Sequence, residues 1–436
     1  MTGTRMLTAL FGMAVAGLVA SDVRGQGVII PPTNNVGGVY IDTDGTVKVR
    51  TTETAGDLAA QRLRAKALNA GAKADGGLTY VSIPRVLEQA KALAAEGKEL
   101  PDDLRYLAGL TSVRYVFMFP GEKDLVIAGP AEPIDATNTL NAFGKITGRP
   151  VLHLDDLVTA LRMAAAADRV RGTVPFGCSI DPAPDSLDKS AAVMRDHARS
   201  SRGERMKAMK DALGPQKVSL FGAPDNSRLS FVTLAADYKL KRMCLALDPI
   251  PVPGVGSPID NSRAAGNRFW FEASYAPLLM SPEGDAFEIR GPRLMLKAGA
   301  LLFDDKGGGT ETGKRFAANF TAKITQLATV TPIFADLQNV TDLALVAHLI
   351  RHDKLAQKAG VDLSYAVSGQ GYKVGTLATP RSAETVVNFT AGSIVAGGVT
   401  LDLASLVGGI KRETDPKGDL KGVKVRPAGW SEAKGK

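Results

Sequence analysis

The chain has 436 residues, of which 44% are hydrophobic and 22% are charged, and its formal net charge is +8. This composition is that of a folded globular protein and excludes a disordered or fibrous chain. The length exceeds that at which one hydrophobic core stops growing, so we expect two packed units or one large elaborated domain.

Residues 1–25 have the anatomy of a signal peptide. Arg5 precedes an uncharged apolar run over residues 6–20, which is shorter than the roughly 20 residues that a membrane-spanning helix needs. Cleavage is expected after Ala20 or after Gly25, followed by a linker over 26–36, and this would leave no transmembrane anchor. The sequence therefore predicts an exported protein, periplasmic or extracellular.

Residues 37–246 are predicted to form a mixed α/β unit. The stretch "GGVYIDTDGTVKVR" alternates apolar and polar residues around Asp44-Gly45, which favours a β-hairpin. A second hairpin is predicted in "VRYVFMFPGEKDLVIAGP", with residues 120–124 as its loop. Helical periodicity is expected at 56–70, at 84–96 and shortly after Pro101.

From about residue 150, short apolar segments alternate with amphipathic ones, a pattern typical of α/β layers. The expected strands are "PVLHL", "TVPFGCSI" and "KVSLFGA". The expected helices cover 155–167, 184–199 and 227–243.

The Pro-rich segment 247–261 is predicted to be a linker that leads to a second unit over 262–410. This unit should open with an antiparallel meander, continue with two helices, and end with a pair of strands within 385–403. The second of these helices begins at Thr331 and Pro332 and is apolar on nearly every side, so we expect it in a core. The predicted fold class is α+β: mixed α/β layers followed by an antiparallel meander with packed helices.

The last stretch, residues 411–436, carries eight Lys or Arg against four Asp or Glu and shows no sustained apolar period. We expect this basic tail to be disordered, because it cannot bury enough surface to offset its chain entropy. Such a tail could attract anionic envelope polymers or nucleic acid without sequence preference.

Cys178 and Cys244 are the only cysteines, and both lie in apolar surroundings, in "PFGCSI" and "KRMCLAL". We expect two free, buried thiols, with a disulfide as the alternative in an oxidising compartment.

In the segment "KGGGTETGKRF", Gly308 and Gly313 are five residues apart and Lys314 follows Gly313, which is the spacing of a phosphate-binding loop. Such a loop needs a Ser or Thr after its Lys to bind magnesium, and Arg315 stands there instead. No nucleotide and no cofactor are therefore expected.

His348 and His352 are four residues apart on a predicted helix, so their rings share one face and are the candidate metal ligands. A third ligand would have to be assumed, and no metal is expected. The alternative is a hydrogen-bonded His348 at the margin of the core.

Asp237, Tyr238 and Lys241 belong to the densest polar cluster inside an apolar element, "LAADYKLKRMCLAL". The spacing of Asp237 and Lys241 predicts an ion pair along the helix. The alternative is a ligand-binding patch to which Tyr238 and Lys241 contribute.

Five segments together resemble one family: "GGVYIDTDG", "FGCSIDPAP", "ADYKLKRMCLAL", "RFWFEASY" and "PIFADLQNVTDLALVAHLI". They are similar to the secreted planctomycete proteins grouped as domain of unknown function 1598, in the same order, over residues 37 to about 350. The resemblance implies a planctomycete source and export, and it brings no activity or catalytic residues. Cys244 stands where the family pattern implies an aliphatic residue, which argues against a disulfide.

Two functions follow as hypotheses. The first is a noncatalytic exported protein that binds an envelope component or a partner protein. The alternative is an extracytoplasmic hydrolase acting on a glycan or peptide, with Asp181 or Asp237 as acid or base. The hydrolase predicts a cleft that holds two convergent carboxylates, one of them with a raised pKa.

Overall fold

The computed structural model describes the following residues: 39–41, 46–49, 78–137, 142–167, 174–181, 183, 185–259, 267–300, 310–388 and 393–424. The predicted signal peptide, the helix expected at 56–70 and residues 306–309 of the candidate phosphate loop, which include Gly308, lie outside them.

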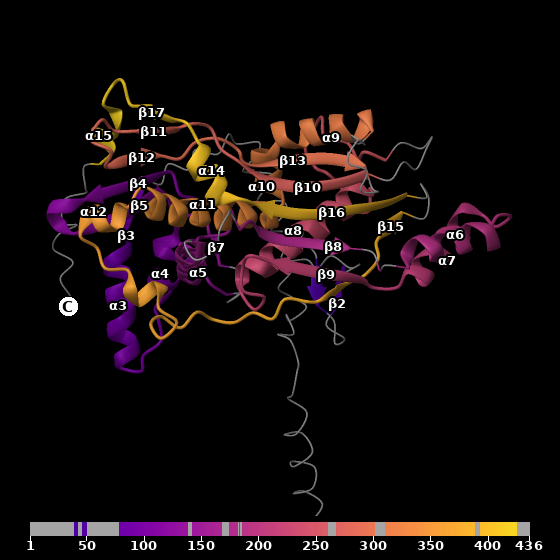
Figure 1. The fold of residues 1–436 in the computed structure, drawn as a ribbon, viewed down its shortest axis with the longest axis horizontal. Helices are drawn as coiled ribbons and strands as arrows, with labels where there is room; N and C mark the ends of the chain where they lie inside the picture. Colours follow the sequence, from indigo (N-terminus) through magenta and orange to yellow (C-terminus); the bar gives the residue numbers. More distant parts are fainter. Residues whose placement is uncertain are drawn as a thin grey trace, which may run out of the picture.

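The larger sheet has nine strands, in the order β1-β2-β14-β9-β8-β16-β10-β13, with β15 paired to β16 (Figure 1). Its pairs are antiparallel except β2–β14 and β16–β10, which are parallel. The strands are β1 Val39–Ile41, β2 Thr46–Val49, β8 Phe176–Asp181, β9 Gln216–Phe221, β10 Asn267–Ser274, β13 Arg293–Ala300, β14 Ser382–Ala383, β15 Val387–Asn388 and β16 Ser393–Leu401.

The second sheet has six strands in the order β17-β11-β12-β4-β5-β3, and only its β11–β17 pair is parallel. These strands are β3 Leu78–Ser82, β4 Tyr115–Phe119, β5 Asp124–Pro130, β11 Leu278–Met280, β12 Ala286–Glu288 and β17 Arg412–Thr414. A two-stranded ribbon joins β6 Ile134–Asp135 to β7 Phe143–Gly144.

The longer helices are α3 Ile83–Ala95, α5 Leu154–Ala166, α6 Ser186–Asp196, α7 Arg202–Leu213, α8 Arg228–Cys244, α9 Glu311–Ala322 and α11 Pro332–His352. The shorter ones are α4 Asp102–Arg105, α10 Ile324–Val330, α12 Leu355–Ala359, α13 Ser364–Val367, α14 Leu403–Gly409 and α15 Asp419–Val423. The α+β class is thereby confirmed, as are both hairpins, the helices near 84–96, 155–167, 184–199 and 227–243, and the last strand pair.

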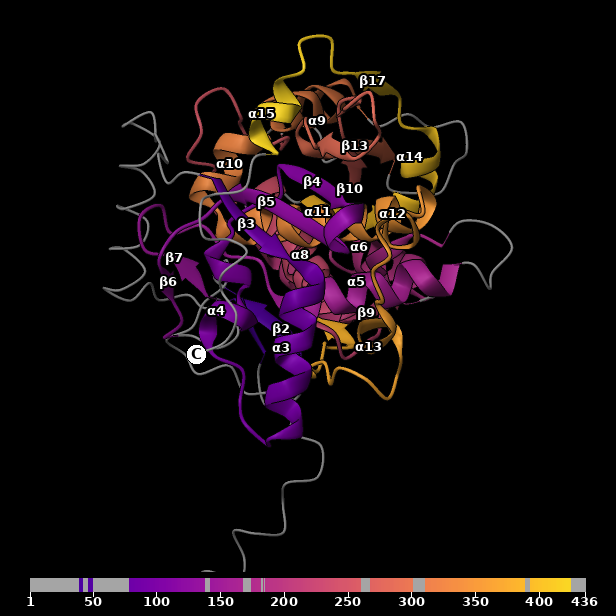
Figure 2. The same ribbon diagram turned by 90° about the vertical axis from the view of Figure 1, so that its left-hand side faces the viewer.

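Helix α11 occupies the centre of the molecule in both views (Figures 1 and 2). Every residue from Pro332 to Ile350 is buried, which confirms the predicted core helix. Within the described part of the chain it is the one helix long and apolar enough to cross a membrane, yet its apolar stretch is wholly buried inside the protein.

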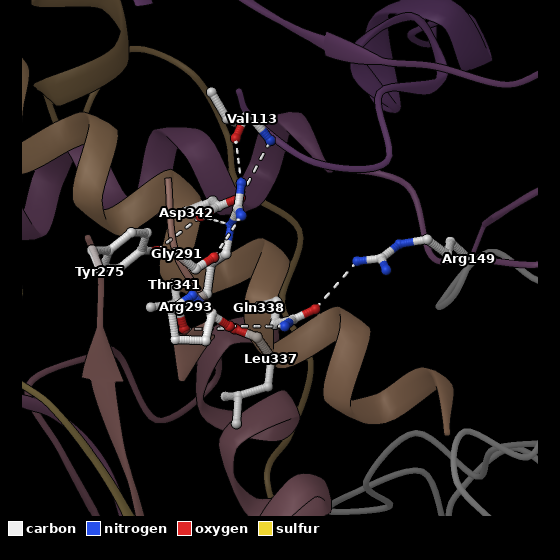
Figure 3. Close-up of polar contacts among 10 residues, drawn as sticks. Val113, Arg149, Tyr275, Gly291, Arg293, Leu337, Gln338, Thr341 and Asp342 are labelled. Carbon is white, nitrogen blue, oxygen red and sulfur yellow. Dashed lines mark hydrogen bonds and ion pairs between the residues drawn. The ribbon is translucent and has the colours of Figure 1, made fainter. Parts of the chain in front are cut away.

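Polar side chains on α11 bind the segments that surround it (Figure 3). Asp342 accepts hydrogen bonds from the Tyr275 hydroxyl at 2.8 Å and from Arg293 Nε at 3.2 Å. Its other oxygen accepts from the Val113 backbone N–H at 3.3 Å. One carboxylate on the helix therefore connects residues that lie in or next to strands of both sheets.

Strands from both sides of the predicted linker 247–261 belong to one sheet, because β16 lies between β8 and β10. The same hydrophobic core also includes buried side chains from both predicted units, such as Phe176 and Phe271. The segment 247–261 therefore connects two parts of one core instead of separating two. Its Val252 and Val255 are themselves buried in that core.

Two further expectations differ from the structure. "PVLHL" forms no strand; it is an extended connector whose Val151 and Leu152 are buried, and His153 precedes α5. The expected meander is interrupted, because β10 pairs with β13 in one sheet while β11 and β12 pair in the other. Apolar alternation shows that a segment is extended, but it does not identify its neighbour.

The first half of the predicted disordered tail is folded. Strand β17 extends the second sheet, and Leu420 of α15 is buried against it. Acidic side chains of the body pair with tail cations: Lys421 with Glu283 at 3.0 Å and Lys424 with Asp285 at 2.5 Å. The tail prediction is therefore wrong for residues 411–424, because partners distant in sequence supply the apolar surface and opposite charge that the tail lacks.

Replacing Leu420 with Ala should lower the free energy of unfolding by about 2–3 kcal/mol, since the side chain is only 2% exposed. Urea denaturation measures this change, and the exposed Lys417→Ala is the matched control, for which a change below about 0.5 kcal/mol is expected. Equal stability of the two variants would show that residues 411–424 do not pack on the body.

Candidate functional site

A pocket of about 720 Å³ lies between α5, the start of α8 and the segment that follows α13. This volume is within the range of roughly 300–1,000 Å³ that is usual for small-molecule sites. The lining residues come from five parts of the chain: Thr159, Arg162, Met163, Ala166 and Ala167; Val174; Gly222, Pro224, Asn226 and Ser227; His348; and Gly369 with Tyr372–Thr376.

One side of the pocket is the turn between β9 and α8. Gly222 has φ +75°, and a Cβ there would lie 2.2 Å from the Pro175 carbonyl oxygen, so only glycine fits this turn. Ser227 caps α8: its hydroxyl donates to the Pro224 carbonyl at 2.6 Å and accepts from the Ser230 N–H at 3.3 Å. The positive end of the α8 dipole therefore lies at the pocket.

The opposite side is formed by residues 369–376, which α5 holds in place. The Asp155 carboxylate accepts from the Tyr372 hydroxyl at 2.7 Å and from the Gly375 N–H at 3.0 Å. Arg162 donates to the carbonyls of Ala366 at 2.8 Å and Tyr372 at 2.5 Å. Asp155 and Arg162 are two helical turns apart and share one face of α5, so both ends of this wall are fixed.

The charged lining residues are cationic. Arg162 and Lys373 line the pocket, and none of the described lining residues is Asp or Glu. The Arg162 side chain binds backbone carbonyls, which do not neutralise its charge, and no described carboxylate forms an ion pair with Arg162 or Lys373. The electrostatic potential in the pocket is therefore expected to be positive.

His348 reaches the pocket from α11 and is 5% exposed. Its Nδ1 is buried and has no hydrogen-bond partner among the described residues. Burial, together with the nearby Arg351 guanidinium, lowers the pKa of His348 to about 4, and Asp402 opposes this only weakly. The imidazole is thus neutral at physiological pH.

The pKa of His348 predicts a dependence of stability on pH. The folded-state pKa of about 4 lies below the unfolded value of 6.5, so the unfolded chain binds more protons between these values. Stability should fall as the pH falls through this window, with a total contribution from His348 on the order of 3 kcal/mol.

Urea denaturation at several pH values would measure this effect. Between about pH 7.5 and 4.5, an interval that covers most of the window between the unfolded value of 6.5 and the folded value of about 4, His348→Asn should lose less stability than the wild type. His352→Asn is the control, because that ring is exposed. Parallel curves for the wild type and His348→Asn would contradict the assignment.

A buried ionic cluster lies next to the pocket. Arg228 follows Ser227, and its guanidinium lies between the carboxylates of Asp156, on α5, and Asp336, on α11. Burial raises the pKa of Asp156 to about 7. The nearby Asp336 carboxylate also raises this pKa, whereas the Arg228 guanidinium lowers it. Since Asp156 is 2% exposed and Asp336 is 0% exposed, this cluster joins three helices and does not face solvent.

Asp237 and Lys241 form the ion pair predicted from their spacing, with Nζ 3.9 Å from Oδ2. The structure places both, together with Tyr238, in the core and not on a ligand-facing surface. Lys241 Nζ also donates to the Ile180 carbonyl at 3.3 Å. On β16, a Cβ at Gly397 would lie 2.2 Å from Asp237 Oδ1, so this strand leaves room for the pair only because it carries a glycine there.

Both cysteines are free and buried, as predicted. Burial and the nearby Asp237 carboxylate raise the pKa of Cys178 and of Cys244 well above the usual thiol value. The thiols are therefore protonated and unreactive at neutral pH.

The other candidate residues do not converge. His352 is exposed and its Nδ1 lies 2.6 Å from Asp353 Oδ1, which also pairs with Arg412 at 2.9 Å. The described residues include no group of three or more His, Cys, Asp or Glu side chains that could hold a metal. Asp181 ends β8 with its backbone opposite Lys217, and its side chain lies outside the described residues.

The described end of the candidate phosphate loop begins a helix. Thr310 caps α9 by accepting from the Gly313 N–H at 3.0 Å. Lys314 pairs with Glu311 at 2.9 Å, one turn earlier on the same helix. These contacts are those of an ordinary helix start.

Apart from His348, the sequence analysis did not identify the lining residues of the pocket. The available signal was "GAPDNS", a turn that ends in a good helix cap. That signal locates the start of α8 but does not identify the α5 face or the segment 369–376 opposite it.

The family model described as protein of unknown function (DUF1598) matches residues 178–257. This finding confirms the resemblance to that family over residues 178–257. The matched part runs from β8 through α8 and includes Gly222, Asn226 and Ser227 of the pocket. No curated protein and no solved structure matches the chain.

Proposed function

We propose that this protein is a noncatalytic binding protein of the cell envelope, which takes a small ligand in the pocket between α5, α8 and residues 369–376. The observation that carries the proposal is a pocket of about 720 Å³ whose walls are held in place by hydrogen bonds that Asp155 accepts and that Arg162 and Ser227 donate. A preformed pocket with apolar walls and few polar groups is the usual form of a ligand site.

The chemistry of the lining supports binding over catalysis. General acid–base hydrolysis by carboxylates needs two of them at the substrate, and none lines the described part of the pocket. Asp156 and Asp336 do converge, but on Arg228 and away from solvent. Asp237, a candidate acid or base for the hydrolase alternative, is 0% exposed beside Lys241.

Filling the pocket should strongly weaken ligand binding without unfolding the protein. Ala166 lines the pocket and is exposed, so Ala166→Trp can block it, whereas Ala165→Trp places the same side chain on the exposed surface of α5 outside the lining. The uncharged fluorophore phenylnaphthylamine should bind the wild type and Ala165→Trp. It should bind Ala166→Trp at least about tenfold more weakly. Equal fluorescence titrations of all three would refute the proposal.

The proposal includes export to the periplasm or the outside of the cell, and a planctomycete source. Its support is the apolar run over residues 6–20 and the resemblance to a secreted family. The intact mass of protein purified from its native host should correspond to a chain that begins after Ala20 or after Gly25. A cytosolic protein that retains Met1 would be inconsistent with export.

Attraction of anionic polymers by residues 411–436 is a secondary part of the proposal. The ion pairs of Lys421 and Lys424 with acidic residues of the body reduce the charge available for it. The binding pocket is therefore the main feature, and the tail contributes at most a weak, salt-sensitive attraction.

A further inference from the structure

The charged side chains that line the pocket differ in sign from the carboxylates that lie next to it. Asp156 and Asp336 are buried beside the pocket, and both form ion pairs with Arg228. The lining itself carries Arg162 and Lys373 and, among the described residues, no carboxylate. The charged groups of the described lining are therefore cations, and the Asp155 carboxylate, which accepts hydrogen bonds from the lining residues Tyr372 and Gly375, is not itself part of the lining.

Two independent features of the lining favour an anion, and a third provides a hydrogen-bonding group. The first is the pair of cations, Arg162 and Lys373, that form no ion pair with a described carboxylate. The second is the N-terminus of α8, a helix of 17 residues whose cap, Ser227, lines the pocket. The third is His348, more than nine-tenths buried, with Nδ1 lacking a described partner. A neutral imidazole can donate a hydrogen bond to an anion or accept one from an acid.

The remaining lining is apolar. Met163, Ala166, Val174 and Val374 contribute hydrocarbon surface, and Tyr372 contributes a ring whose hydroxyl is already bound to Asp155. Sugars and other strongly hydrated ligands gain little from such walls, whereas an alkyl or aryl group is desolvated favourably on them.

We infer that the ligand is a small amphipathic anion, with a carboxylate or phosphate group near Lys373, Arg162 and the start of α8 and an apolar body against Met163 and Val174. This inference rests on the proposed function and adds the chemical class of the ligand. The anionic group would balance the unpaired charge of the lining, and the apolar body would bury the hydrocarbon walls.

Matched acids and amides test the inference with the wild-type protein. Octanoate and naphthoate should bind at least about tenfold more tightly than octanamide and naphthamide, which have nearly the same shape without the charge. Octylammonium should bind more weakly still. Isothermal titration calorimetry at low salt measures each affinity, and added salt should weaken only the binding of the acids.

Variants of Lys373 test whether its charge contributes to anion binding. Lys373→Gln should weaken octanoate binding by about threefold to fivefold, and the charge reversal Lys373→Glu should weaken it further. Octanamide binding should not change in either variant. Lys358→Gln is the control, because Lys358 is an exposed lysine of α12 outside the lining.

Different results would contradict the binding function and the anionic class of the ligand. Equal affinity for acids and amides, or a preference for the ammonium, would overturn the anion assignment even if Ala166→Trp still blocked phenylnaphthylamine, and the binding function would then stand. Absence of all binding, including that of phenylnaphthylamine, would overturn both.

Discussion

The structure depends on one constraint: α11 is buried on every side, yet it carries polar side chains that need partners. A buried polar group without a hydrogen bond costs stability, so surrounding segments must supply those bonds. Asp336 binds Arg228 of α8, Asp342 binds Tyr275 and Arg293, and Asn339 donates to the Pro150 carbonyl at 2.9 Å. The helix thereby fixes the positions of segments that lie 49 to 189 residues away along the chain.

This constraint explains why the chain forms one core despite its Pro-rich segment 247–261. The nine-stranded sheet contains strands from both sides of that segment, and the parallel pair of β16 with β10 brings the end of the chain beside its middle. The second sheet is tied to the same helix through Val113 and Asp342 (Figure 3). Both sheets therefore contact one central helix, α11, which fixes their positions relative to it.

The pocket is a consequence of the same packing. Arg228, held by Asp156 and Asp336, fixes the start of α8 against α5 and α11, while Ser227, one residue earlier, faces the pocket. Asp156 and Asp336 form ion pairs with Arg228 inside the protein, whereas the cations Arg162 and Lys373 line the pocket. The cationic lining thus follows from how the core distributes its charges, and the proposed binding of an anion rests on it.

The sequence by itself determined the local features. Alternation and the loop at 120–124 predicted the β4–β5 hairpin, and helical periodicity predicted α3 and α8. The apolar character of nearly every side of the helix that begins at Thr331 and Pro332 placed α11 in the core. These features depend on neighbours within a few residues. Only the tertiary structure decided which strands pair, that residues 411–424 fold, and that Asp155 holds Gly375 across 220 positions of sequence. Such contacts depend on surface and charge supplied by distant segments, which no local period encodes.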